Sequence, residues 1–120
     1  MEYDFKFHFN KRKQFCEVYL WDVHPNTFAN WGGGRWGYYQ SQDNNNTYGK
    51  IGEVHLISKR VRVDLVSHEL THVVFDWFGK RNIAINSRTE ERFASILDEM
   101  IRSFYREYKK YEHTRKRKVV

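Results

Sequence analysis

Residues 61–79, which read VRVDLVSHELTHVVFDWFG, decide the fold. Apolar side chains recur in this stretch every three or four residues, which is the period of an α-helix with one buried face. Gly79 follows the last periodic residue and is expected to cap the end of this helix. A second periodic stretch includes Phe93 and runs to about residue 112, which predicts a long C-terminal helix.

The residues before the first helix have the period of β-strands. Apolar and polar side chains alternate at residues 3–9 and again at residues 15–23, which predicts a hairpin. Shorter strands are expected near residues 35–40 and at residues 51–58. Strands followed by two helices are typical of the α+β class, here with a small antiparallel sheet of three to four strands and both helices on one face.

Composition excludes several classes of protein. The chain is 40% hydrophobic and holds one proline, which does not fit collagen-like or low-complexity proteins. No apolar run approaches the roughly 20 residues of a membrane span, so no membrane partner is expected. The first residues lack the basic-then-apolar pattern of an export signal, and Cys16 is the only cysteine. A cytoplasmic location is therefore expected.

The net charge of +6 is concentrated at one end of the chain. Residues 1–100 hold 13 basic and 13 acidic side chains, whereas residues 101–120 hold eight basic and two acidic ones. We therefore expect a single domain over residues 1–112 and a basic tail over residues 113–120. Such a tail is suited to nucleic acid or to an acidic partner, or its cations simply stabilise a solvated helix end.

Residues 68–72, His-Glu-Leu-Thr-His, follow the pattern H-E-x-x-H inside the first predicted helix. Histidines four residues apart lie one helical turn above each other, so both imidazoles can bind one tetrahedral metal ion. Glu69 would lie beside that ion, where it can take a proton from a bound water. His68 and His72 are therefore candidate zinc ligands, and Glu69 is the candidate general base.

A third ligand is expected from the next helix. Glu91 follows His72 after eighteen residues. Glu90 is a rival, but Ser87 and Glu90 have the spacing of a capping box, which gives Glu90 a task at the helix start. Asp76, one turn beyond His72, is another rival for the metal, or a group that supports a ligand histidine, or a solvent-facing charge.

The HELTH motif, the eighteen residues after it and the segment Glu91-Arg-Phe-Ala-Ser resemble the gluzincin metallopeptidases, with the spacing of the aminopeptidase N family. Chain length and the preceding strands resemble the single-domain minigluzincins. The resemblance implies a zincin-like fold and a peptidase with one Zn²⁺ ion held by His68, His72 and Glu91, with Glu69 as general base. It also implies that Ser95 contacts a ligand histidine and helps to hold it in place, without binding the metal itself.

The same resemblance suggests how a substrate binds. In zincins a strand of the sheet beside the metal accepts the substrate as an added strand, and Val54, His55 and Leu56 would form that rim. Aminopeptidase N-like enzymes also carry a Gly-Ala-Met-Glu-Asn segment, which this chain lacks, so an endopeptidase is favoured. The donor to the oxyanion stays open between Tyr48, Tyr38, His55 and an arginine, or zinc acts alone.

Two functions follow from these patterns. The first is a zinc-dependent peptidase that acts on peptide or protein substrates through a metal-activated water and Glu69. The alternative is a zinc-stabilised binding module whose basic tail docks nucleic acid or a protein partner. A tail that lies in the cleft and inhibits the peptidase is also considered. The segment Trp31-Gly-Gly-Gly-Arg-Trp36 is interpreted as a loop held by packed indoles, or as part of a cleft or a base-stacking surface.

Overall fold

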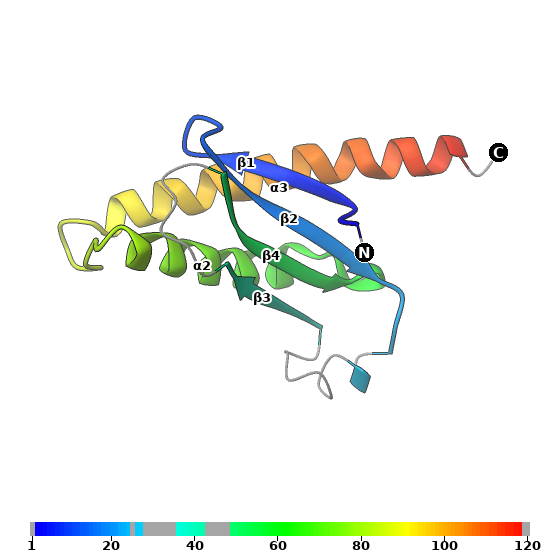
Figure 1. Ribbon diagram of the computed structural model, residues 1–120, viewed down its shortest axis with the longest axis horizontal. Coiled ribbons are helices and arrows are strands. Elements are labelled where there is room, and N and C mark those ends of the chain that lie inside the picture. The colour runs from blue at the N-terminus through cyan, green and yellow to red at the C-terminus, as the bar shows by residue number, and fades with distance from the viewer. Residues whose placement is uncertain (1, 25, 28–35, 43–48, 119–120) are drawn as a thin grey trace.

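Four strands are followed by two long helices, and the predicted α+β class is confirmed (Figure 1). The computed structural model describes residues 2–24, 26–27, 36–42 and 49–118. The elements in chain order are β1 (Phe5–Phe9), β2 (Gln14–Trp21), β3 (Gly37–Ser41), β4 (Gly49–Ile57), a 3-10 turn (Ser58–Arg60), α2 (Val63–Lys80) and α3 (Glu90–Lys118). Trp31, Tyr48 and the last two residues of the predicted tail lie outside the described residues.

The first two strands form the predicted hairpin. β1 and β2 pair antiparallel, with Phe7 opposite Cys16. The turn between them contains three consecutive residues with positive φ, Asn10, Lys11 and Arg12, at 54°, 55° and 64°. Alternation along β1 places its three phenylalanines on the buried face of the sheet, and its lysine and histidine on the other face.

The sheet is mixed, although an antiparallel sheet was expected. Its strand order is β1-β2-β4-β3, and β2 and β4 run parallel, whereas the other two pairs are antiparallel. The backbone N–H of Gly49 donates to the carbonyl of Lys13 at 2.8 Å, which aligns the start of β4 with the start of β2. β3 therefore becomes the edge strand beside β4, and β1 forms the other edge.

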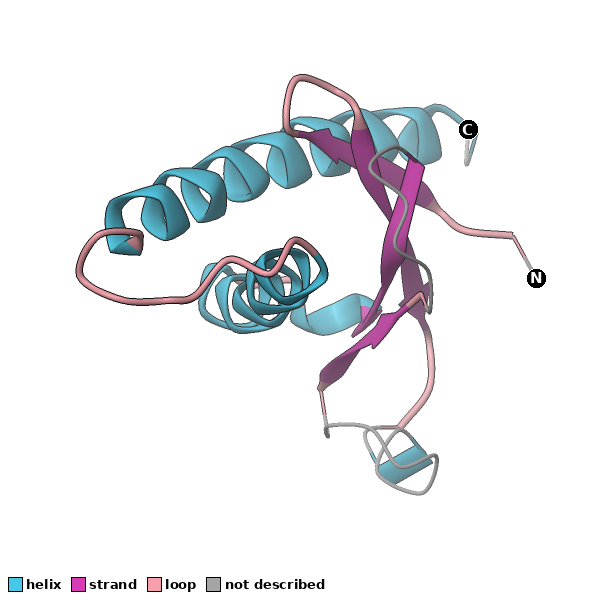
Figure 2. Cartoon of the chain, turned by 60° about the vertical axis from the view of Figure 1, so that its left-hand side comes forward, coloured by secondary structure: helices cyan, strands magenta, loops and turns pink. Residues whose placement is uncertain are grey.

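Both helices cover the same face of the sheet, as Figure 2 shows. α3 packs against β1, and α2 packs against β3 and β4. The core between sheet and helices is rich in aromatic and β-branched side chains, and its buried members include Phe5, Phe7, Phe9, Val18, Val54, Leu56, Val66, Leu70, Val73, Trp77, Phe78, Met100 and Phe104. The C-terminal part of α3 extends beyond the sheet in Figure 1.

The end of α2 uses a different residue from the one predicted. Gly79 lies inside the helix, and the left-handed residue after the helix is Asn82, with a φ of 55°. The N–H of Ile83 donates to the carbonyl of Phe78 at 2.9 Å, and the N–H of Asn82 donates to the carbonyl of Gly79 at 3.1 Å. This pair of bonds is a Schellman motif, in which asparagine takes the position that glycine usually occupies.

α3 begins later and ends later than predicted. It starts at Glu90, after a turn in which the carbonyl of Asn86 accepts the N–H groups of Thr89 and Glu90 at 3.0 and 2.9 Å, so Ser87 does not cap it. It continues to Lys118, which makes residues 113–118 of the predicted tail helical. Neither α2 nor α3, within the described part of the chain, has an apolar stretch long enough to cross a bilayer.

Candidate functional site

The two histidines of the HELTH motif lie side by side on the exposed face of α2. The Nε2 atoms of His68 and His72 are 3.3 Å apart, and the ring planes meet edge to face at 84°. Both side chains are exposed, whereas Glu69 and Leu70 between them are buried. The four-residue spacing thus brings two nitrogen donors together at the surface of the helix, as the geometry of an α-helix requires.

Glu69, next to His68 in the chain, is buried where α2 contacts the edge strand β3. It is only 4% exposed, and its Cγ lies 3.5 Å from the position that a Cβ on Gly37 of β3 would occupy. Burial raises the pKa of the Glu69 carboxyl group, and the positive charge of His68 opposes that shift. This carboxyl group forms no hydrogen bond or ion pair with another residue that the structure describes. It is therefore a buried acid at the contact between α2 and the edge strand.

Glu91, the predicted third ligand, is not grouped with the two histidines in the structure. It lies exposed in the first turn of α3. Phe93 packs on Phe75 and Phe78, with ring centroids 5.0 and 5.4 Å apart, and α3 runs antiparallel to α2. This packing sets the register between the helices, so that Glu91 lies level with the C-terminal part of α2, beyond His72.

Within the described ranges, no group of three or more His, Cys, Asp or Glu side chains is arranged to hold a metal ion. Neither Glu90 nor Asp76, the rivals for the third ligand, is therefore grouped with the two histidines in the structure. Ser95 is exposed on α3 and makes no hydrogen bond to a described side chain, so its predicted role behind the ligands has no structural support.

The chain matches no model of a protein family, no curated protein and no solved structure. The resemblance to gluzincin metallopeptidases rested on three ligands at a fixed spacing. Because the described residues bring only two of the three together, the assignment to that family is wrong. The structure does place a pair of histidines and a buried glutamate on one helix.

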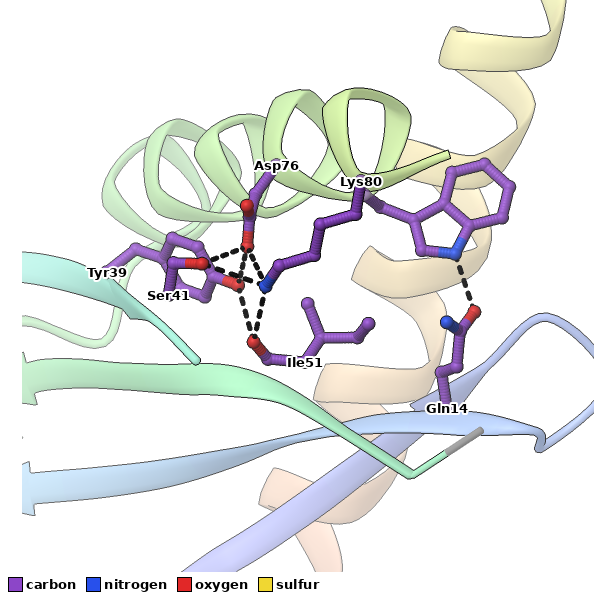
Figure 3. Close-up of polar contacts among 7 residues, drawn as sticks. Gln14, Tyr39, Ser41, Ile51, Asp76 and Lys80 are labelled. Atoms are coloured by element: carbon purple, nitrogen blue, oxygen red, sulfur yellow. Dashed lines mark hydrogen bonds and ion pairs between the residues drawn. The ribbon is translucent and has the colours of Figure 1, made fainter. Parts of the chain in front are cut away.

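Asp76 is hydrogen-bonded to the edge strand and to its own helix, α2. Its Oδ2 accepts hydrogen bonds from the hydroxyl groups of Tyr39 and Ser41 at 2.6 and 2.7 Å, and from the ammonium group of Lys80 at 2.9 Å (Figure 3). Lys80 also donates to the carbonyl of Ile51 at 3.1 Å. This cluster holds β3 and β4 against the second half of α2. Its lysine, tyrosine and serine form no sequence motif, so only the fold could reveal it.

The predicted substrate rim on β4 is also wrong, because β4 is an interior strand. It is hydrogen-bonded to β2 on one side and to β3 on the other, so its backbone cannot accept an added strand. Val54 and Leu56 are buried in the core under the helices. The edge strand nearest to α2 is β3, whose first residue, Gly37, lies beside Glu69.

His55 lies on the opposite face of the sheet from the helices, since it alternates with Val54 and Leu56. It is 5% exposed and is stacked between the rings of Tyr19 and Tyr38, with centroids 4.7 and 4.4 Å away. The indole N–H of Trp21 donates to its Nδ1 at 2.9 Å, and its Nε2 lies 3.1 Å from Glu53 Oε1.

This arrangement fixes the protonation of His55. Because an indole nitrogen can only donate, Nδ1 must be the acceptor, and Nε2–H donates to Glu53. Burial lowers the pKa of His55, and Glu53 opposes that shift. His55 and its neighbour Tyr38 are therefore separated from the histidine pair by the sheet, and neither can be the oxyanion donor. Tyr48, the other tyrosine considered for this role, lies outside the described residues.

A cavity of about 280 Å³ adjoins His68. The described residues around it are Trp36, Arg62, Asp64, Leu65 and His68. Leu65 and the Trp36 indole supply apolar surface, and Arg62 forms an exposed ion pair with Asp64 at 3.3 Å. The carbonyl of Trp36 accepts a hydrogen bond from the N–H of Ile57 at 3.0 Å, which fixes the backbone of this wall to β4.

Proposed function

We propose that the chain is a hydrolase of peptide bonds that uses one zinc ion held by His68 and His72. The observation that carries the proposal is the 3.3 Å separation of the two Nε2 atoms. Two Zn–N bonds of about 2.0–2.1 Å at the tetrahedral angle require nitrogens about 3.3–3.4 Å apart. The donor pair therefore fits two corners of a zinc tetrahedron, and this site is distinct from the three-ligand site of the gluzincins.

When bound, zinc would lower the pKa of a coordinated water and polarise a substrate carbonyl group. The chain's own contribution to catalysis is the carboxyl group of Glu69. Burial raises the pKa of this carboxyl group, which makes it a better proton acceptor than an ordinary glutamate, and it can then donate the proton to the leaving amine. Gly37 is the residue of the edge strand that packs on the Glu69 side chain, and a Cβ there would lie only 2.9 Å from the carbonyl oxygen of His55 and from Cδ2 of Leu56.

The cavity beside His68 supports a peptide substrate. Its volume of about 280 Å³ suits one large side chain, and Trp36 and Leu65 supply apolar walls. Arg62 is the arginine among the described residues that line the cavity, and it is our candidate for the oxyanion donor. The proposal includes a cytoplasmic location, which the buried, unpaired thiol of Cys16 supports.

The test combines metal content with turnover. The full chain is incubated with zinc and desalted, and its zinc is measured by elemental analysis in the wild type, His72→Ala, Glu91→Ala and, as a matched control on α3, His113→Ala. We expect zinc in the wild type, in Glu91→Ala and in His113→Ala, and its loss in His72→Ala. Loss of zinc in Glu91→Ala would reinstate the three-ligand site and contradict the two-histidine proposal.

Turnover separates a catalytic ion from a structural one. A mixed peptide library is incubated with wild type and with Glu69→Gln, and the products are identified by mass spectrometry. We expect Glu69→Gln to bind zinc normally but to cleave about 10²–10⁴-fold more slowly, since it lacks the general base. Equal cleavage by both proteins, or cleavage by the zinc-free protein, would refute the mechanism.

A further inference from the structure

The exposed face of the second half of α3 carries a stripe of basic residues. Arg102, Arg106, Lys109 and His113 recur at intervals of four, three and four residues, so they share one side of the helix. All four side chains are exposed. The stripe covers eleven residue steps, or about 16 Å along the helix axis. We call these four residues the basic stripe.

The two arginines and the lysine of the basic stripe form no ion pairs with described side chains. Within the described part of the chain, no acidic side chain forms an ion pair with Arg102, Arg106 or Lys109. Glu107 pairs instead with Lys110 at 3.3 Å, on the flank of the stripe. Glu112, the other acid in this half of α3, is half-buried and interacts with Tyr108.

This concentration of charge contrasts with the rest of the chain. Residues 1–100 sum to zero, so the whole net charge of +6 belongs to the last 20 residues. Concentrated charge of one sign raises the local concentration of an oppositely charged partner and speeds its association. The sequence places this charge in residues 101–120, and the structure shows that the segment is helical as far as Lys118, which sets the positions of its exposed side chains along one helix.

The spacing of the charges indicates the partner. A small anion requires donors that converge on one point, whereas the stripe presents cations in a line, about one per helical turn. Apolar side chains normally form the centre of a protein interface, but the large exposed apolar residues of the described chain, Tyr3, Val63, Phe75 and Ile85, all lie outside α3. Contacts to a phosphate backbone need only a line of cations. We propose that the basic stripe binds the phosphate backbone of nucleic acid.

The test measures the salt dependence of binding. A fluorescent 20-base-pair DNA duplex and a 20-nucleotide RNA strand are each titrated with the full chain between 50 and 200 mM NaCl. The slope of log K against log salt is about −0.9 per phosphate contacted on duplex DNA and about −0.7 on a single strand. For DNA we expect a wild-type slope of about −3 to −4. The relative affinities show whether the stripe prefers a duplex or a single strand.

A triple variant and a charge-matched control locate the surface. Arg102→Gln, Arg106→Gln and Lys109→Gln together should reduce the DNA slope by about 3 and weaken binding at 50 mM salt at least tenfold. The control replaces Lys11, Arg12 and Lys13 in the hairpin turn with Gln, which removes the same charge from another exposed site. We expect the control to bind like the wild type.

Three results would overturn the proposal. They are absence of binding at 50 mM salt, equal weakening by the triple variant and its control, and equal affinity for poly-glutamate of matched length. Each single substitution should reduce the slope by about 0.9, which keeps the test valid if the triple variant loses helix by circular dichroism. Glu69→Gln should bind nucleic acid like the wild type, so this proposal and the hydrolase can fail separately.

Discussion

Replacing Asp76 with alanine tests whether Asp76 and its hydrogen-bond partners hold the edge strand β3 against α2. The substitution removes one acceptor that three donors share, the hydroxyl groups of Tyr39 and Ser41 and the ammonium group of Lys80. Two of these donors keep another acceptor, because Tyr39 and Lys80 also reach the carbonyl of Ile51 at 3.3 and 3.1 Å. The cost is therefore smaller than the loss of three independent bonds.

The expected destabilisation follows from the remaining partners. Hydrogen bonds to a charged group contribute about 1.5–3 kcal/mol each in favourable cases, and partial replacement by Ile51 reduces the sum. We expect Asp76→Ala to lower the free energy of unfolding by about 2–3 kcal/mol, which for 120 residues lowers Tm by about 10 °C. Asp76→Asn keeps one acceptor oxygen and should lose about half as much.

Urea denaturation followed by circular dichroism measures these values. Asp98→Ala is the matched control, since Asp98 is exposed on α3 and forms no ion pair with a described residue. It should change stability by less than about 0.5 kcal/mol. A loss of under about 1 kcal/mol in Asp76→Ala would show that the cluster does not hold β3 to α2, and the reasoning from its distances would be wrong.

Three further predictions concern single residues. Gly79→Ala should stabilise the protein by about 0.5–1 kcal/mol, because Gly79 is helical and its added Cβ meets open space; destabilisation in the same assay would mean that Gly79 is the cap after all. Burial raises the pKa of the Cys16 thiol, so a thiol reagent at pH 8 should label it at least about 100-fold more slowly than the unfolded chain; fast labelling would contradict its burial. Because burial raises the pKa of Glu69, the wild type should lose stability as the pH rises above the ordinary pKa of a glutamate. Glu69→Gln should lack that loss. Equal thermal stability of the two proteins at pH 4 and again at pH 8 would contradict the raised pKa.

Much of the fold was predictable because it depends on local periods. Alternation in residues 3–9 and the helical period in residues 61–79 each identify one element and its buried face, and both match the structure. The helix ends were less predictable. Gly79 is the residue that usually ends a helix, but Asn82 also tolerates a positive φ, and the Schellman bonds at Ile83 select it.

The direction of β4 could not be predicted from its residues. A strand buried on one face has the same alternation whether its neighbour is parallel or antiparallel. Whether β4 runs parallel or antiparallel to β2 depends on the path of the chain between the two strands. The pattern of residues 51–58 carries no information about that path. The error mattered, because an interior β4 cannot form the substrate rim that Val54, His55 and Leu56 were expected to provide.

In the candidate site, too, the contacts within one helix were predictable and the contacts between helices were not. The approach of His68 and His72 is fixed by the α-helix itself, so a spacing of four residues was enough to predict it. The position of Glu91 depends on how two helices pack, and one turn of helix moves a side chain about 5.4 Å along the axis. Phe93 fixes that register by packing between Phe75 and Phe78. A spacing of eighteen residues across a connector therefore cannot define a metal ligand unless the aromatic packing on either side of it agrees.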